Sequence, residues 1–402
     1  MKLYLQFGWG MKKLVLDLAK TWEKVNVILS PRDITPKQLQ NWSGEFEKAN
    51  VSCLFDPQCY YPKSDHRILS QYSYWNNLMS KNLSLELNNV NSLITNIKEY
   101  NDIIGTEKFI VPGIIRKFDE EWFSKWERES KKLVSVSRNI VGRKKTLLTL
   151  ALSFGVLNQS DELIEKIVLS CEKLDVDGYY IIAEPIEGKY LSDEPLWLSN
   201  LLQLCAGLKL LDKEVVVGYA NQQLLCLSTA KVDAIASGTY LNVRKFSNKF
   251  EKSDTKIKRK SVWYYYPESL SEYKISFLDV AFNNRVLEEM KPGDDYNNEY
   301  VNLIFSGIMP QSTNFKESLA FKHYLECLRA QAASCSRESF ENTISANEIL
   351  LTTAERRIEI LEKAGVYAQT RSFKDVVDVN RSAIQRLEKT RGFLMKYSWD
   401  EL

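Results

Sequence analysis

Three carboxylates each follow a short apolar run of the sequence, a position from which acid–base chemistry is often done. They are Asp33, Asp56 and Glu184. In cleavage of a glycosidic bond, one carboxylate stabilises a positively charged carbon while another handles the proton. We therefore treat these residues as the candidate catalytic groups. A structural interpretation stays open, since Asp33 could cap the helix that follows and Asp56 could simply end a strand.

Amide, hydroxyl and aromatic side chains stand at similar positions along the chain. Such groups can read the edge of a nucleobase through paired hydrogen bonds and stack on its face. The candidate base-binding residues are Gln6, Gln58, Tyr60, Tyr219, Asn221 and Ser237. Each alone could be structural, whereas convergence of several at one site favours a ligand pocket without naming the ligand.

Basic residues are concentrated at 245–260, just before the aromatic cluster at 263–266. Basic side chains can hold a nucleic-acid backbone while aromatic rings stack on bases. The candidate nucleic-acid-binding residues are Arg32, Arg244, Lys256, Lys258, Arg259 and Lys260. The same segment could equally be a solvated loop that leads into an aromatic strand.

The elements that position these residues follow from an alternation of apolar runs and amphipathic stretches. The expected strands are 2–7, 25–29, 52–55, 109–111, 147–152, 178–183, 215–218 and 234–237. The expected helices between them are 11–23, 36–48, 119–132, 161–173, 197–210 and 222–230. This alternation is typical of a closed barrel or a doubly wound sheet. Eight units within about 240 residues favour a (β/α)8 TIM-like barrel, whose site forms where the strands end.

The domain organisation follows from the point at which this pattern stops. We expect the barrel at 1–245, with 64–108 as a helical insertion, a basic and aromatic linker region at 246–315, and a mainly α-helical C-terminal region at 316–402. The clearest helical stretches there are 318–334, 338–363 and 376–395. Their broad apolar faces could cover the barrel, form a homo-oligomer or bind a protein partner.

Composition excludes several classes of function. Lys plus Arg number 54 against 52 for Asp plus Glu, so a general polyanion-coating role is not implied. Seven scattered cysteines and two histidines predict no metal site. Neither a P-loop nor a Rossmann glycine fingerprint is present, so no cofactor is expected. The sequence has no run of eighteen apolar residues and no signal-peptide pattern, and we expect a cytoplasmic protein without a membrane span.

Several segments carry a family resemblance through their order along the chain. They read Phe-Asp-Pro-Gln-Cys-Tyr-Tyr-Pro at 55–62, Val-Pro-Gly at 111–113, a Gly-Tyr strand ending in Glu-Pro at 178–185, Val-Val-Gly-Tyr-Ala-Asn at 216–221, Val-Asp-Ala-Ile-Ala-Ser at 232–237 and Phe-Lys-His-Tyr-Leu at 321–325. In this order they resemble the tRNA-guanine transglycosylase superfamily. The resemblance implies a barrel that exchanges a base in tRNA, or inserts 7-deazaguanine bases into DNA, with Asp56 as a base-recognition aspartate.

The chain differs from that family at the residues that carry out the family's reaction. The family's aspartate nucleophile aligns with Ala236, and its zinc-binding cysteines and histidine are missing. An alanine cannot form a covalent glycosyl intermediate. The end of the second strand also differs, which leaves Asp33 as a displaced candidate acid or base.

Three functions therefore remain open. The first is a glycosyltransferase of the base-exchange type, or an N-glycosidic enzyme, acting on a purine or 7-deazapurine in DNA, RNA or a nucleoside. The second is a catalytically inactive module that binds a nucleobase or nucleic acid within a larger complex. The third is an unrelated barrel enzyme acting on a small polar metabolite. Two of the three carboxylates within about 5–10 Å of each other would fit glycosidic chemistry.

Overall fold

The computed structural model describes residues 1–62, 66–75, 87–247 and 261–402. In these residues eight parallel strands form one sheet, and β1 pairs with β8. The strands are β1 (Lys2–Gln6), β2 (Val25–Leu29), β3 (Val51–Phe55), β4 (Lys108–Val111), β5 (Lys145–Leu152), β6 (Gly178–Ala183), β7 (Glu214–Val217) and β8 (Ala234–Ser237). The predicted (β/α)8 barrel is confirmed, and the doubly wound alternative is excluded because the first strand pairs with the last.

The barrel is nearly closed, with a seam between β3 and β4. The strand order runs β3-β2-β1-β8-β7-β6-β5-β4, and no ladder joins the two end strands in the described part of the chain. The loops that follow these strands do meet, since the Ile115 N–H donates to the Tyr60 carbonyl at 2.9 Å. This hydrogen bond draws the two edges together at the carboxyl ends of the strands, where a barrel site forms.

Both faces of the sheet are apolar because side chains alternate between the barrel interior and the surrounding helices. Tyr4, Tyr180 and Ala236 belong to an inner cluster that fills the barrel. Their neighbours Leu5 and Ile181 belong to the larger core between strands and helices. Most expected strands were recognisable for this reason.

Helices surround the barrel much as the periodicity predicts. They are α1 (Lys12–Leu18), α2 (Pro36–Lys48), α4 (Leu87–Ile104), α5 (Trp122–Val141), α6 (Phe154–Leu157), α7 (Asp161–Glu172) and α8 (Pro195–Leu210). The stretch expected as a helix at 222–230 is the 3-10 helix η2 (Gln222–Ala230). Of the expected insertion at 64–108, residues 63–65 and 76–86 lie outside the described residues, and α4 fills most of the remainder.

The interpretation of Asp33 as a helix cap is wrong. Thr35 caps α2, accepting the Gln38 N–H at 3.2 Å while the Gln38 side chain accepts the Thr35 N–H at 2.9 Å. This reciprocal capping box leaves the Asp33 carboxylate for other contacts.

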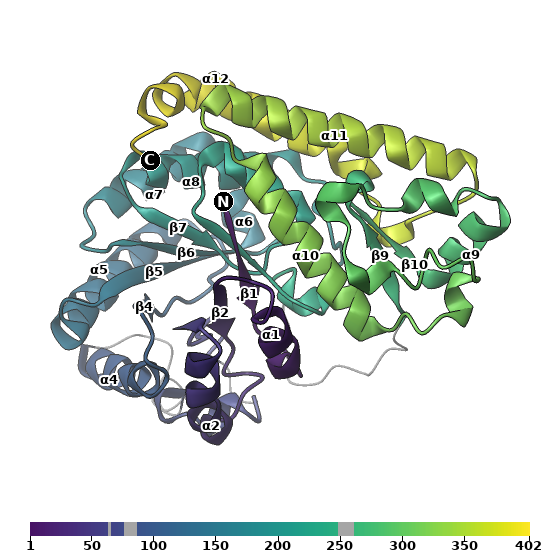
Figure 1. Cartoon of the computed structure of the whole chain (residues 1–402). Helices are drawn as coiled ribbons and strands as arrows, with labels where there is room; N and C mark the ends of the chain where they lie inside the picture. The colour runs from purple at the N-terminus through teal and green to yellow at the C-terminus, as the bar shows by residue number, and fades with distance from the viewer. Residues whose placement is uncertain (63–65, 76–86, 248–260) are drawn as a thin grey trace.

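The chain from residue 261 to residue 402 covers one side of the barrel, and from here on we call all of it the C-terminal region (Figure 1). Its elements are the antiparallel hairpin β9 (Trp263–Tyr266) and β10 (Ser271–Lys274), then α9 (Ile275–Asn283), α10 (Glu317–Cys335), α11 (Phe340–Lys363) and α12 (Val377–Ser398). α11 and α12 lie side by side, and α12 packs on α8, which is buried along nearly its whole length. The described part of the expected linker region carries a packed cluster of its own, which includes Tyr264, Leu278 and Met290. None of the described helices has the length and hydropathy needed to cross a membrane.

A buried ionic network joins the barrel to the C-terminal region. Arg244, which follows β8, donates to the Gly238 carbonyl at 2.8 Å and to Glu272 of β10 at 2.9 Å. Arg371 donates to the same Glu272 oxygen at 2.7 Å, and the Arg244 guanidinium lies 3.4 Å from the Tyr324 ring centre. Burial alone would raise the pKa of Glu272, but the charges of Arg244 and Arg371 lower it overall.

We expect Glu272→Gln to destabilise the protein by about 3–5 kcal/mol, because it leaves buried Arg244 without a counter-ion. Urea denaturation measures the free energy of unfolding. The control is Glu348→Gln, which removes a carboxylate paired with Arg381 at 2.9 Å on the exposed side of α11. An exposed pair of this kind contributes at most about 1 kcal/mol. Equal losses in the two variants would contradict a structural role for the buried network.

Candidate functional site

A buried polar cluster around Asp56 fills the carboxyl end of the barrel. The Asp56 side chain is fully buried, and its Oδ1 accepts the Gln58 N–H at 2.9 Å. Its Oδ2 accepts hydroxyl hydrogen bonds from Tyr60 at 2.7 Å, Tyr180 at 3.3 Å and Tyr219 at 3.4 Å. Burial raises the pKa of Asp56 to about 6, and these hydrogen bonds limit the rise.

Further candidates extend this cluster towards β1 and β2. The Gln58 amide nitrogen donates to Ser30 at 2.7 Å and to Tyr219 at 3.0 Å, and its oxygen accepts the Arg32 N–H at 2.9 Å. The Ser30 hydroxyl in turn donates to Asp33 at 2.9 Å. Asp33 and Asp56 are therefore joined through Ser30 and Gln58, as convergence at the strand ends predicts.

Gln6 and Gly218 complete the cluster through their contacts with Tyr180. The Gln6 oxygen accepts the Tyr180 hydroxyl at 3.1 Å, while its buried amide nitrogen has no partner in the described part of the chain. A Cβ atom at Gly218 would lie 2.5 Å from the Tyr180 hydroxyl oxygen. A glycine at this position thus makes room for the tyrosine that reaches Asp56.

An aromatic cluster seals Asp56 from solvent. The Phe246 ring lies 5.2 Å from Tyr60, 5.3 Å from Tyr219 and 6.3 Å from Tyr61, measured between ring centres. Phe246 itself is only 1% exposed. The expectation that Asp56 faces a ligand at an open mouth therefore fails in this conformation, because the rings stand between it and the solvent.

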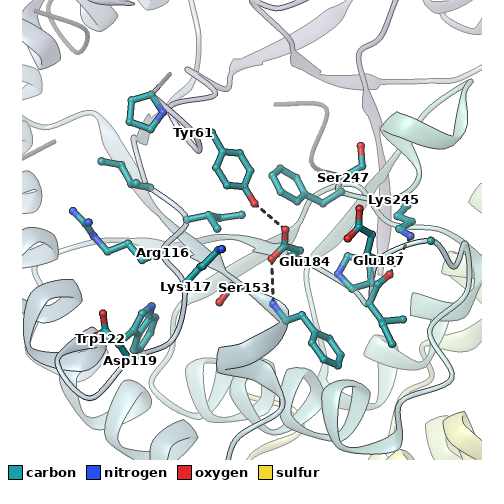
Figure 2. A pocket seen from close by; sticks show the side chains of 18 of the residues that line it. Tyr61, Arg116, Lys117, Asp119, Trp122, Ser153, Glu184, Glu187, Lys245 and Ser247 are labelled. Carbon is teal, nitrogen blue, oxygen red and sulfur yellow. Dashed lines mark hydrogen bonds between the residues drawn. The ribbon is translucent and has the colours of Figure 1, made fainter. Parts of the chain in front are cut away.

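An accessible pocket of about 830 Å³ lies beside the sealed cluster (Figure 2). Its walls come from the loops after β3, β4, β5 and β6 and from the segment after β8. We call it the Glu184 pocket, and its main lining residues are Tyr61, Arg116, Lys117, Trp122, Phe154, Glu184, Glu187, Lys245 and Phe246. Of the three candidate carboxylates, only Glu184 lines it. The predicted catalytic trio is thus divided, with Asp33 and Asp56 in the polar cluster and Glu184 in the pocket.

The Glu184 carboxylate is fixed from two sides. Its Oε1 accepts the Tyr61 hydroxyl at 2.8 Å, and its Oε2 accepts the Phe154 N–H at 3.3 Å (Figure 2). The Glu184 backbone is held as well, since the Trp197 indole donates to its carbonyl at 2.9 Å. A carboxylate has about four acceptor positions, and two of them receive no donor from the described residues, so they are available to a ligand.

The cations of the pocket differ in their partners. Arg116 pairs with Glu129 at 2.5 Å, and Lys125 pairs with Glu121 at 2.7 Å. Lys117 is exposed and forms no ion pair within the described ranges. Lys245 donates to the Ile186 carbonyl at 3.3 Å and also to the Lys189 carbonyl. Burial lowers the pKa of Lys245, and the charges of Glu187 and Glu184 oppose that change.

Three further candidates are buried and do not line the Glu184 pocket. Asn221 donates to the Tyr190 carbonyl at 3.3 Å and caps η2, and the Ser237 hydroxyl lies 3.5 Å from the Tyr324 hydroxyl. Arg244 is 2% exposed and paired with Glu272. The expectation that Arg244 contacts a nucleic-acid backbone is therefore wrong, because its guanidinium is enclosed by protein.

The remaining basic candidates divide in two. The half-buried Arg32 lies beside Asp33, and burial lowers its pKa while Asp33 raises it. Lys256, Lys258, Arg259 and Lys260 lie outside the described residues. Within the described ranges, no group of three or more His, Cys, Asp or Glu side chains is arranged to hold a metal ion.

Sequence reasoning missed Lys117, Lys245 and Phe246 as pocket residues. Tyr61 belongs to the Tyr-Tyr-Pro turn that was singled out, and Lys245 opens the basic run. No local signal places Phe246 over the barrel, since its partners come from segments far away in the sequence.

Comparisons with known proteins add little to this geometry. No family model matches the chain, and no curated protein is significantly similar to it. Among solved structures it is similar to a tetrameric deoxyribose phosphate aldolase from Aeropyrum pernix, with 12% identity and a TM-score of 0.35. The match covers 62% of this chain and 90% of the aldolase chain. At this distance the likeness carries no information about activity.

The raised pKa of Asp56 predicts a distinctive dependence of stability on pH. The folded protein holds the Asp56 proton up to about pH 6, whereas an unfolded aspartate releases it near pH 4. The contribution of Asp56 to stability is therefore greatest below pH 4 and falls as the pH rises to about 6. Relative to wild type, Asp56→Asn should gain about 3 kcal/mol between pH 4 and pH 7.

Urea denaturation of wild type and Asp56→Asn at several pH values measures this difference. Tyr60→Phe provides an independent check, because loss of its 2.7 Å hydrogen bond should raise the pKa of Asp56 further and move the fall in stability to higher pH. Parallel pH profiles for wild type and Asp56→Asn would show that Asp56 is not buried as an ionisable group.

Proposed function

We propose that this barrel binds a nucleobase-bearing ligand in the Glu184 pocket, as part of DNA or RNA or as a nucleoside. The observation that carries the proposal is the Glu184 carboxylate, fixed in the wall of an open pocket between aromatic rings and amines. The volume of about 830 Å³ lies in the usual range for small-molecule sites.

Each part of a nucleotide has a suitable counterpart in this pocket. The Watson–Crick edge of guanine presents adjacent N–H donors, which a carboxylate accepts well. Tyr61 is half-buried and stacks on the buried Phe246 ring with an interplanar angle of 22°, so it offers the pocket an aromatic surface. Lys117 supplies a positive charge for a phosphate.

The reaction that best fits this ligand is base exchange or N-glycosidic cleavage at a purine or 7-deazapurine. The resemblance to the tRNA-guanine transglycosylase superfamily supports this class, although Ala236 is fully buried inside the barrel and does not line the pocket. Any such chemistry must use groups from the loops around Glu184.

A binding module without catalysis is the second candidate function. It is favoured by the division of the carboxylates, since Glu184 lies in the pocket without Asp33 or Asp56. Both candidates share the base-binding step, which is therefore the step to test first.

We expect guanosine, a 7-deazaguanine nucleoside or a guanine-containing oligonucleotide to bind wild type in isothermal titration calorimetry. Glu184→Gln should weaken binding by about 10- to 100-fold, because a hydrogen bond to a charged group contributes about 1.5–3 kcal/mol. Glu187→Gln removes the same charge from the exposed rim of the same pocket and should change affinity by less than about threefold. Absence of binding by all three ligands, or equal binding to Glu184→Gln and wild type, would rule out base recognition here.

A further inference from the structure

Lys245 occupies an unusually well-fixed position in the wall of the Glu184 pocket. The residue before it, Arg244, is anchored by Glu272 and the Gly238 carbonyl. The residue after it, Phe246, is enclosed by the rings that seal the barrel. The Lys245 backbone is therefore held on both sides, and its side chain lines the edge of the pocket, where its amine lies against the loop at 186–189 (Figure 2).

The surroundings of the Lys245 amine suit a nucleophile better than a structural cation. It forms no ion pair within 4 Å among the described residues, and its partners are the carbonyls of Ile186 and Lys189. A neutral amine has two N–H groups and one lone pair, so two carbonyl acceptors satisfy both N–H groups and leave the lone pair for a ligand. Partial burial favours the neutral form, while the facing carboxylates Glu184 and Glu187 favour the charged form.

We propose that Lys245 is the amine nucleophile of the Glu184 pocket and forms an imine with the sugar carbon of its ligand. The inference rests on the proposed function, because it assumes a base-bearing sugar. It places the nucleophile after β8, nine residues beyond Ala236, and Ala236 is the position that aligns with the aspartate of the resembled family.

The proposed reaction balances without a cofactor. The Lys245 lone pair attacks the anomeric carbon, and the bond to the base breaks with its electron pair moving to the base nitrogen. The base then takes the proton that the attacking amine loses. The remaining amine lone pair expels the ring oxygen, which takes a proton from water, and a protonated imine results. The hydroxide left by that water adds to the imine carbon, which restores the free amine and releases the sugar as an aldehyde.

Reductive trapping tests for this amine directly. Glycolaldehyde with sodium cyanoborohydride at pH 7 reduces any imine to a stable secondary amine, which peptide mass mapping locates. We expect Lys245 to be labelled at least about tenfold faster than Lys117, an exposed lysine in the same pocket. In Lys117→Arg the labelling of Lys245 should persist, and in Lys245→Arg the fast-labelled site should be lost.

Labelling of Lys245 no faster than Lys117 in wild type would overturn the proposal, and that comparison needs no variant to fold. Calorimetry with guanosine on the same preparation separates this result from the proposed function. Guanosine binding with slow labelling leaves base recognition in place and removes the nucleophile. Fast labelling of Lys245 together with borohydride trapping of a guanine-containing oligonucleotide supports the inference, and trapping that survives in Lys245→Arg overturns it.

Discussion

Burying a carboxylate in a barrel is unfavourable unless donors surround it, and this requirement shapes the whole carboxyl end of the fold. Asp56 receives hydroxyl groups from Tyr60, Tyr180 and Tyr219, which come from three separate parts of the barrel. These contacts require the strands to keep their register and require a glycine at position 218. Two of these tyrosines, Tyr60 and Tyr219, also enclose Phe246. The hydrogen bonds to the Asp56 carboxylate thus fix the tyrosines that enclose Phe246. The Glu184 pocket lies beside this enclosure and shares Tyr61 and Phe246 with it.

The C-terminal region contributes to the site through the segment that follows β8. Arg244 is held by Glu272, so the hairpin β9–β10 fixes the path of the chain into Lys245 and Phe246. The apolar surface of α8 gives the second reason for docking, because α12 packs along it and shields part of it from water. A charged contact and an apolar contact thus hold the two regions in one arrangement, which keeps the pocket wall in place.

The strands were predictable from sequence because their signal is local: short runs that are apolar on both faces, separated by amphipathic stretches. The capping box at Thr35 and Gln38 was equally local and could have shown that Asp33 is not the cap. The site was less predictable. Burial of Asp56 depends on Phe246, and burial of Arg244 depends on Glu272. Neither partner can be recognised from its spacing along the sequence. A polar residue after a strand indicates the correct end of the barrel, but its exposure is decided by distant segments.

The segments that resemble the transglycosylase superfamily lie around Asp56, whereas the open pocket lies around Glu184. This separation limits which residues can take part in any chemistry at the barrel. The segments at 55–62, 178–185 and 216–221 supply most of the Asp56 cluster, so they account for the shape of the mouth more than for its reactivity. Ala236 is in register with Tyr4, belongs to the cluster that fills the barrel and does not line the Glu184 pocket. Reactive groups must therefore come from the loops after β6 and β8, where Glu184 and Lys245 line the same pocket. With the centre of the barrel filled and sealed, a ligand meets the barrel in this conformation at its loops.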